Sequence, residues 1–377
     1  MRAAALVVFG LVLHAQNAIR SGVYEVTLRL PVDGLVAQEE MQVEYRVTDT
    51  SRVDPVMGAA PVIRAQARSV IEMPAMPGMA KLVETAHPEG VPGEYGVHPV
   101  FPHGGDYRLT LAITPPGAAE FSVQFPLNVG DGGASRGKPK PRPYFAEVRS
   151  TPRSPRAGEP AELVFTVRSR INGVVSVVKE FDIQHERPMH LIAVRSDLGE
   201  FAHEHPDPSP SGEFKLGYTF PTAGDYTLFV DAAPRGAGGQ VMPVQLKVGG
   251  PKTAKFQLAA QPLDGETRAG SIHVKFDTAR FGVGRTLRME SVVRDAKSKA
   301  VVNDIQPYLG ALGHMILVHE DGLSFVHSHP DELDERQGRD GRLAFLARFP
   351  KPGRYRGWVQ VRRQGTVHTA PFVVEAR

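Results

Sequence analysis

The chain has 377 residues, 41% of them hydrophobic and 23% charged, with a formal net charge of +3 at pH 7. At about 150 residues per domain this length predicts two or three globular domains, and the near-neutral charge argues against a nucleic-acid partner. Cysteine is absent, which excludes disulfides, iron–sulfur clusters, cysteine-ligated zinc and a thiol nucleophile, whereas histidine occurs 14 times.

The N-terminal segment has the features of a signal peptide. A basic residue, Arg2, precedes an apolar run at 3–13, and small residues follow around Ala15 and Ala18. The run is shorter than the roughly 20 residues that span a bilayer. We therefore expect 1–18 to be a signal peptide, the mature protein to be periplasmic or secreted, and no membrane span to remain after cleavage. An N-terminal anchor or a first strand is the alternative.

One motif, Phe-Pro-x-x-Gly-x-Tyr, occurs three times, at 101–107, 220–226 and 349–355. The copies lie roughly 120–130 residues apart, close to the size of one β-sandwich domain. The Pro and Gly predict a tight turn. The Tyr is expected to begin a half-buried strand and to form a hydrogen bond through its hydroxyl. The motif predicts three copies of one structural unit.

Alternating apolar and polar residues support a β structure for these units. The alternation runs through 41–47 and again through 163–167, where only Val164 breaks it. It is typical of antiparallel sheets with one packed face and one wet face, and no stretch keeps a 3.6-residue apolar period. Together with 38 glycines and 32 prolines for turns, the pattern predicts an all-β chain of three tandem β-sandwiches.

Composition shifts mark the domain boundaries. We predict domain one at 22–129, a linker at 130–143, domain two at 144–248, a second linker at 249–267 and domain three at 268–377. The first linker is rich in Gly, Pro and basic residues, so it cannot lie inside a sheet, and we expect a solvated spacer rather than a contact for anionic surfaces.

Domains two and three share a histidine pattern in which a His-x-His-Pro sequence follows a first histidine at the same interval. The histidines are His190, His203 and His205 in domain two and His314, His327 and His329 in domain three. A single His-x-His is more typical of a solvated strand edge than of a ligand pair. Two copies in the same spacing favour metal ligands, although duplication also copies purely structural features.

Hairpin geometry explains the spacing. Asp321-Gly322 predicts a two-residue type I′ turn, which places His314 opposite His329, with His327 two positions along on the same face. Cβ atoms directly opposite lie about 4.5–5.5 Å apart and diagonal ones about 7–8 Å apart. Three imidazoles can then meet at one ion at about 2.0–2.1 Å.

The same register applies to domain two. With Asp197-Leu198 in the turn and Gly199 as a bulge next to it, His190 lies opposite His205. Without a metal, three clustered histidines would set like charges against one another at mildly acidic pH.

The remaining histidines carry weaker signals. His185 and His319 have the wrong parity to join the triads, so we predict them at the surface, and His368 near the C-terminal strand is a candidate fourth ligand. No pattern involves His98, His103 and His273.

Domain one lacks the first histidine of the pattern. Its His87 corresponds to His205, and Met73, Met76 and Met79 replace the first histidine in a proline-containing loop. Thioethers favour Cu(I), but methionine also fills loops packed on a sandwich. Whether these methionines and His87 form a further site stays open.

At these residues the chain resembles known families. Domain one, with Met-Pro-Gly-Met at 76–79, Gly-Glu-Tyr at 93–95 and its copy of the motif at 101–107, resembles the YtkA-like domain family of small exported β-sandwich modules. The segments at 203–206 and 327–330 resemble related exported modules associated with copper and other heavy metals. The resemblance implies immunoglobulin-like or cupredoxin-like sandwiches that handle metal.

The favoured function is therefore an exported, non-enzymatic metal-binding protein that sequesters copper or transfers it to another exported metal-handling protein, with zinc as the second choice. All-imidazole sites suit copper, zinc or nickel, and the affinity order favours Cu(II) over Zn(II). Without cysteine, a blue-copper site is excluded. Glu204 points to the opposite face and is Ser328 in the other copy, so no general base stands out.

Two alternatives belong to other classes. The sandwiches could form a structural or interaction module that binds a protein or glycan partner, with the histidines only shaping a surface. A metallo-oxidase or hydrolase could use the open coordination position of a three-histidine site. It would need an acid or base within hydrogen-bond reach of the bound water.

Overall fold

The computed structural model describes most of the chain. The described residues are 17–31, 34–37, 39–55, 58–89, 91–131, 143–171, 173–235, 237, 239–258, 264–266, 272–276, 281–283, 286–330 and 336–377. Residues 1–16 of the predicted signal peptide and 132–142 of the predicted first linker lie outside them.

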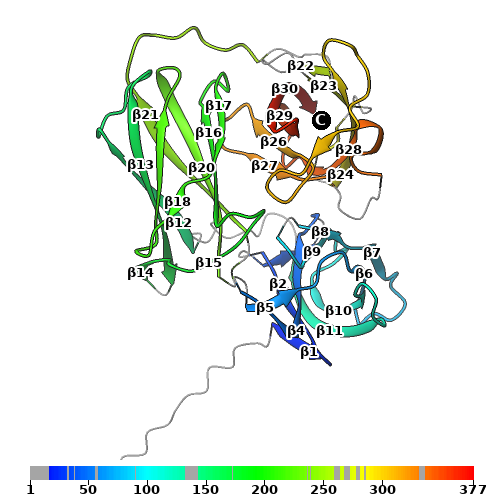
Figure 1. The fold of residues 1–377 in the computed structure, drawn as a ribbon. Coiled ribbons are helices and arrows are strands. Elements are labelled where there is room, and N and C mark those ends of the chain that lie inside the picture. Colours follow the sequence, from blue (N-terminus) through cyan, green and yellow to red (C-terminus); the bar gives the residue numbers. More distant parts are fainter. Residues whose placement is uncertain are drawn as a thin grey trace, which may run out of the picture.

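The described chain is built from strands, with a single short 3-10 turn, η1, at Arg339–Gly341. The strands form six sheets that pair into three sandwiches (Figure 1). The prediction of an all-β chain of tandem immunoglobulin-like sandwiches is confirmed. Among the described residues, no helix has the length and apolarity that crossing a bilayer requires.

Domain one packs a six-stranded sheet, β1-β2-β4-β9-β8 with β5 beside β4, on a five-stranded sheet, β3-β11-β10-β6-β7. As the alternation predicted, Val43, Tyr45 and Val47 of β4 are fully buried in its core. Its strands are β1 Ala18–Ser21, β2 Tyr24–Arg29, β3 Leu35–Val36, β4 Val43–Asp54, β5 Gly58–Pro61, β6 Gln66–Glu72, β7 Leu82–Thr85, β8 His87–Pro88, β9 Glu94–Val97, β10 Gly105–Thr114 and β11 Phe121–Gly130.

Domain two has one sheet in the order β12-β13-β19-β18, with β14 beside β13, and a second in the order β15-β20-β16-β17, with β21 beside β20. The second sheet carries the histidine hairpin, β16–β17. The strands are β12 Tyr144–Thr151, β13 Pro160–Ile171, β14 Val174–Val177, β15 Phe181–Asp182, β16 Met189–Arg195, β17 Phe201–Glu204, β18 Asp207–Pro208, β19 Glu213–Thr219, β20 Gly224–Pro234 and β21 Gln240–Val248.

Domain three repeats this plan, with sheets β22-β23-β24-β28 and β25-β29-β26-β27, and with β30 beside β29. Its first strand, β22, lies inside the predicted second linker and pairs with β23. The strands are β22 Asp264–Glu266, β23 Ile272–Phe276, β24 Thr286–Asp295, β25 Ile305–Gln306, β26 His314–His319, β27 Phe325–Ser328, β28 Arg342–Arg348, β29 Gly353–Arg363 and β30 Thr366–Ala376.

The Phe-Pro-x-x-Gly-x-Tyr motif forms the same corner in each domain. The Tyr hydroxyls of Tyr107, Tyr226 and Tyr355 each donate to the carbonyl four residues earlier, at 2.8–2.9 Å. The motif Phe packs edge-on against the Tyr ring at centroid distances of 4.9–5.0 Å. The motif glycine has φ between 133° and 150°, a conformation that favours glycine.

The hairpin turns differ in type from the prediction. A type I′ turn needs positive φ at both central residues, but Gly322 has φ 68° while Asp321 is not left-handed. The N–H of Gly322 donates to the carbonyl of His319 at 2.8 Å, and the N–H of His319 donates to Ser324 at 2.9 Å. The loop therefore has four residues, 320–323. Because it is centred on the same midpoint, the predicted register is unchanged.

Domains two and three pack against each other through the strands that carry the histidines. Every residue of β16 and of β26 is buried. Their inner faces enter their own cores, and their outer faces meet in an apolar cluster that includes Ile192, Val194, Ile316 and Val318. A continuous apolar run is typical of a strand covered on both faces.

This interface has an approximate two-fold arrangement. Phe201 of domain two stacks on Trp358 of domain three with centroids 4.4 Å apart, and Phe325 of domain three stacks on Phe229 of domain two at 4.9 Å. In Figure 1 the green hairpin β16–β17 accordingly lies next to the orange hairpin β26–β27.

Domain one contacts both other domains through ion pairs. Asp182 of domain two forms ion pairs with Arg29 at 3.6 Å and with Arg46 at 3.2 Å, and Arg348 of domain three pairs with Glu40 at 3.2 Å.

Candidate metal centre

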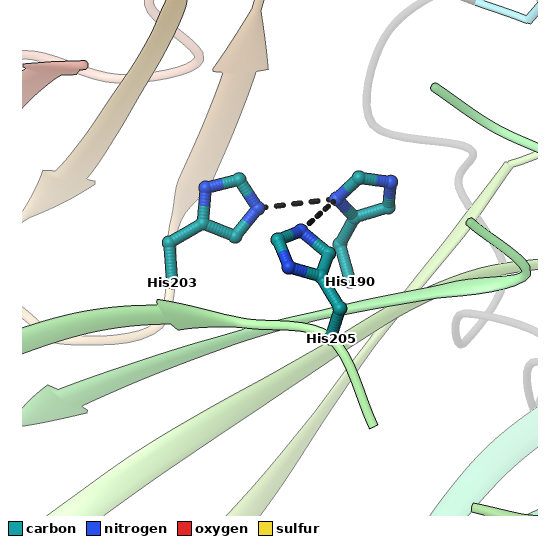
Figure 2. A group of neighbouring side chains, drawn as sticks. All are labelled: His190, His203 and His205. Carbon is teal, nitrogen blue, oxygen red and sulfur yellow. Dashed lines mark hydrogen bonds between the residues drawn. The ribbon is translucent and has the colours of Figure 1, made fainter. Parts of the chain in front are cut away.

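The domain-two histidines meet at one point. The pairing of Ile192 with His203 and of Leu191 with Glu204 is the predicted register, and it ends one residue before His205. His190 Nδ1 lies 3.1 Å from His203 Nε2 and 3.2 Å from His205 Nε2. Figure 2 shows these ring nitrogens turned toward one another.

The domain-three histidines repeat this arrangement. Met315 pairs with Ser328 in the predicted register, and His314, His327 and His329 each offer a ligand atom within 4.8 Å of the others. His314 Nδ1, His327 Nε2 and His329 Nε2 are buried and have no hydrogen-bond partner among the described residues. These are the same ring atoms that converge in domain two.

Hydrogen bonds outside the domain-two triad fix where its protons lie. His190 Nε2 is 3.0 Å from the carbonyl of Gln184, so Nε2 carries the proton and Nδ1 a lone pair. His203 Nδ1 is 2.6 Å from Gln360 Oε1, whose amide nitrogen donates to Thr369. His203 therefore carries its proton on Nδ1, and two lone pairs face each other across 3.1 Å.

The domain-three triad is fixed in the same way. His314 Nε2 is 2.9 Å from the carbonyl of Tyr308, and His327 Nδ1 is 3.1 Å from Asp231 Oδ2. Both partners are acceptors, so His314 Nε2 and His327 Nδ1 carry the N–H groups. In the neutral imidazole form that binds metal, the nitrogens that face the centre of the triad then carry lone pairs.

The spacing of the nitrogens fits one small ion. Ligand nitrogens at about 2.0–2.1 Å from a tetrahedral ion lie about 3.3 Å from one another, and the two contacts in the domain-two triad measure 3.1 and 3.2 Å. A shared cation would replace lone-pair repulsion with three coordinate bonds.

Burial disfavours the charged form of five of the six triad histidines. Desolvation, followed by the nearby His327, lowers the pKa of His190 to about 4 and that of His314 to about 3. Desolvation also lowers the pKa of His205 to about 3 and holds the pKa of His203 and of His329 well below the ordinary value. Neutral imidazole is the form that binds metal.

His185 was predicted at the surface, and that prediction is wrong. Its ring is buried and stacks on His329 of domain three with centroids 3.6 Å apart. It lies in the loop before β16 with φ 43°, and Leu309, in the loop before β26, has a similar φ of 51°. The prediction assumed that side chains alternate between two faces, as they do along a strand. His185 lies in a loop, where no such alternation holds.

His319 is also buried rather than exposed. Its Nε2 lies 3.2 Å from the carbonyl of Pro352, and its Nδ1 lies beside Asp321 in the turn at 3.0 Å. It stabilises the hairpin turn. His368, the candidate fourth ligand, lies opposite Val361 in β30 and belongs to neither triad.

In domain one, His87 meets His98 rather than the methionines. His87 Nε2 is 3.0 Å from His98 Nδ1, and its Nδ1 is 3.4 Å from Glu89 Oε1. Met73 and Met79 pack on the domain core, and Met76 is exposed. No spacing pattern in the sequence pairs His98 with His87.

A cavity of about 420 Å³ joins these groups. Its lining includes His190 and Asp231 of domain two, His327 and His329 of domain three, and His87 of domain one. The cavity gives small solutes a route to the triads.

Two further polar residues of the site, Asp231 and Gln360, were missed from the sequence. Asp231 pairs with His190 across β20 and β16, and Gln360 pairs with His314 across β29 and β26. The signal was available: each is a polar residue in a buried apolar strand, at the same distance after the motif Tyr.

One family model matches the chain twice, at residues 146–250 and 267–377, and its description is Domain of unknown function (DUF8832). The two segments together make up more than half of the chain and correspond to the two histidine-bearing sandwiches. No curated protein matches the chain by sequence.

The solved structures that match the chain share little sequence with it. FetP of uropathogenic Escherichia coli is 15% identical, with 30% of this chain and 92% of that chain covered and a TM-score of 0.24. The E. coli adhesin FdeC is 12% identical, with 93% and 96% covered and a TM-score of 0.21. Invasin, a bacterial integrin-binding protein, is 12% identical, with 93% and 60% covered and a TM-score of 0.19. These scores are low, so the fold assignment rests on the strands described above. By its two matches in tandem, the chain belongs to the DUF8832 family.

Proposed function

We propose that this protein is an exported, non-enzymatic metal-binding protein that sequesters or transfers ions through two three-histidine sites. Copper is the favoured ion and zinc the second. The observation that carries the proposal is the proton arrangement at His190 and His203, where outside acceptors force two lone pairs to face each other. The triad of domain three repeats the arrangement.

The donor set favours borderline ions. Neutral imidazoles suit copper and zinc better than hard cations such as calcium, which take oxygen ligands. Three protein ligands leave one position open, where a ligand from an acceptor protein can enter and remove the ion. This suits transfer as well as storage.

Binding is favoured over catalysis because Asp231, the carboxylate that contacts His327, is already engaged. Asp231 accepts from His327, so it orients a ligand rather than a water. Glu204 pairs in register with Leu191, adjacent to His203 and therefore on the opposite face of the strand.

The sequence supports export, and the cavity supports a partner. The signal-like segment at 1–18 and the resemblance of domain one to YtkA-like modules support a periplasmic or secreted protein. The cavity that reaches from His87 to the triads supports exchange with a second exported metal-handling protein.

Metal analysis tests the proposal. The purified, chelator-stripped chain is titrated with Cu(II) or Zn(II), and bound metal is counted by mass spectrometry. We expect two ions per chain, and no stoichiometric binding after His203→Ala with His327→Ala. His103→Ala, at an exposed position outside the triads, is the matched control. Unchanged binding in the double variant would overturn the proposal, and absence of binding in the unaltered chain would favour a structural or interaction module.

A further inference from the structure

The two triads share one buried interface, and each is completed by the other domain. Ring centroids of His203 lie 5.7 Å from His314 and 5.6 Å from His327, so the triads are direct neighbours. The contacts that fix the middle histidine of each triad come from across the domain boundary.

We propose that Asp231 and Gln360 are cross-domain positioning residues that make the two metal sites unequal, with the tighter site at His314, His327 and His329. This inference rests on the proposed function. It goes further because it names what sets the metal affinity of each site. Asp231 of domain two acts on the domain-three site, and Gln360 of domain three acts on the domain-two site.

The two residues occupy equivalent positions. Each pairs in register with the first histidine of its own triad, Asp231 with His190 and Gln360 with His314. Their side chains nevertheless contact the middle histidine of the opposite triad. Asp231 Oδ2 lies 3.1 Å from His327 Nδ1, and Gln360 Oε1 lies 2.6 Å from His203 Nδ1.

The apolar interface holds this exchange in place. The stacks of Phe201 on Trp358 and of Phe325 on Phe229 cross the boundary in the same reciprocal way. Phe229 lies two residues before Asp231 in β20 and Trp358 lies two residues before Gln360 in β29, so the stacks hold the strands that carry both residues. The crossed contacts are therefore a property of the docked pair of domains rather than of either domain alone.

The chemistry of the two positions differs. A carboxylate that accepts the outer proton of a metal-bound imidazole raises the basicity of that ligand and offsets the charge of the ion. An amide oxygen fixes the ring but carries no charge. Asp231 is only 8% exposed, so solvent screens its charge weakly. The domain-three site should therefore bind a divalent cation more tightly than the domain-two site.

A second asymmetry acts on the same site. His185 of domain two stacks on His329, whereas Leu309 holds the equivalent loop position in domain three. The domain-three site therefore receives two domain-two groups, His185 and Asp231. The domain-two site receives the neutral amide of Gln360.

Single-site chains test the inference with Zn(II) alone as the probe. His205→Ala disables the domain-two site and His329→Ala disables the domain-three site. In the first background we expect Asp231→Asn to weaken Zn(II) binding by about 10–100-fold, the usual effect of changing a group that hydrogen-bonds to a ligand. In the second background the same change should alter the dissociation constant by less than about 3-fold, and Gln360→Ala should weaken binding there instead. Asp225→Asn, an exposed acid on the same strand β20, is the matched control.

A metal-free readout keeps the test independent of zinc. Long-range nitrogen–proton NMR spectra report which ring nitrogen of each histidine carries the proton. We expect His327 and His203 to be protonated at Nδ1 in the folded apo chain, and His327 alone to change in Asp231→Ala.

The outcomes separate the two proposals. Two bound ions, with Asp231→Asn acting on the domain-two site or on neither site, would overturn the inference and leave the proposed function intact. Protonation of His327 at Nε2 in the apo chain would also overturn the inference. A chain that binds no Zn(II) or Cu(II) would overturn both.

Discussion

Two groups of clustered ligands face the same cavity, and they differ in how their protons are placed. In the domain-one group, His87 Nε2 lies 3.0 Å from His98 Nδ1, so one proton can sit between the two rings, and His87 Nδ1 lies 3.4 Å from Glu89 Oε1. In the triads, outside acceptors take the protons and leave lone pairs to meet. The comparison separates ligand atoms that share a proton from ligand atoms whose lone pairs face one another. A shared cation would relieve the repulsion between lone pairs that face one another.

The largest change in stability and in metal binding should come from disrupting the interface that holds the two triads together. Trp358 is buried and stacks on Phe201. Trp358→Ala should lower the free energy of unfolding by about 3–5 kcal/mol and weaken metal binding at both triads, because the crossed contacts depend on docking. Denaturant unfolding and Zn(II) titration measure both effects. A loss of stability with unchanged Zn(II) affinity would mean that the triads do not depend on the interface.

The next largest effect should be the stabilisation of the chain by metal bound at the triads. A ligand at 100 times its dissociation constant stabilises the native state by about 2.7 kcal/mol per site. Thermal unfolding with and without Zn(II) should therefore show a rise in melting temperature that His203→Ala with His327→Ala abolishes and the control His103→Ala keeps. A rise that persists in the double variant would place the stabilising ion elsewhere.

The pH dependence of the metal-free chain gives a smaller effect. Burial lowers the pKa of His190 to about 4 and of His314 to about 3, so the unfolded chain binds more protons below about pH 6.5. Stability is therefore full above that pH and falls as the pH drops toward 4, by up to about 1.4 kcal/mol per pH unit for each such histidine. Denaturant unfolding between pH 7 and pH 4.5 measures it. Constant stability over this range would show that these rings are not buried as neutral groups.

The smallest effect should follow from the domain-one group. His87→Ala removes the residue that contacts both Glu89 and His98. We expect unchanged metal stoichiometry and less than about a 3-fold change in affinity at the triads, whose ligands His87 does not touch. A calorimetric titration beside the unaltered chain checks this. Loss of one bound ion would show that His87, Glu89 and His98 form a site of their own.

Local sequence patterns predicted much of the fold and of each triad. The alternation at 41–47 and 163–167 and the repeated motif indicated tandem sandwiches, and the midpoint of the hairpin placed the three histidines of each triad on one face. The turn type at Asp321-Gly322 was wrong. The predicted strand pairing was still correct because a four-residue loop with the same midpoint keeps the register.

By itself, the sequence determined which histidines form each triad, since a strand alternates its side chains with period two and a hairpin pairs residues about one midpoint. Only the tertiary structure decided that the two triads meet, that His185 joins them, and that Asp231 and Gln360 reach across to the opposite domain. These contacts depend on how the outer faces of two separate sheets dock, and no local periodicity records which surface covers another.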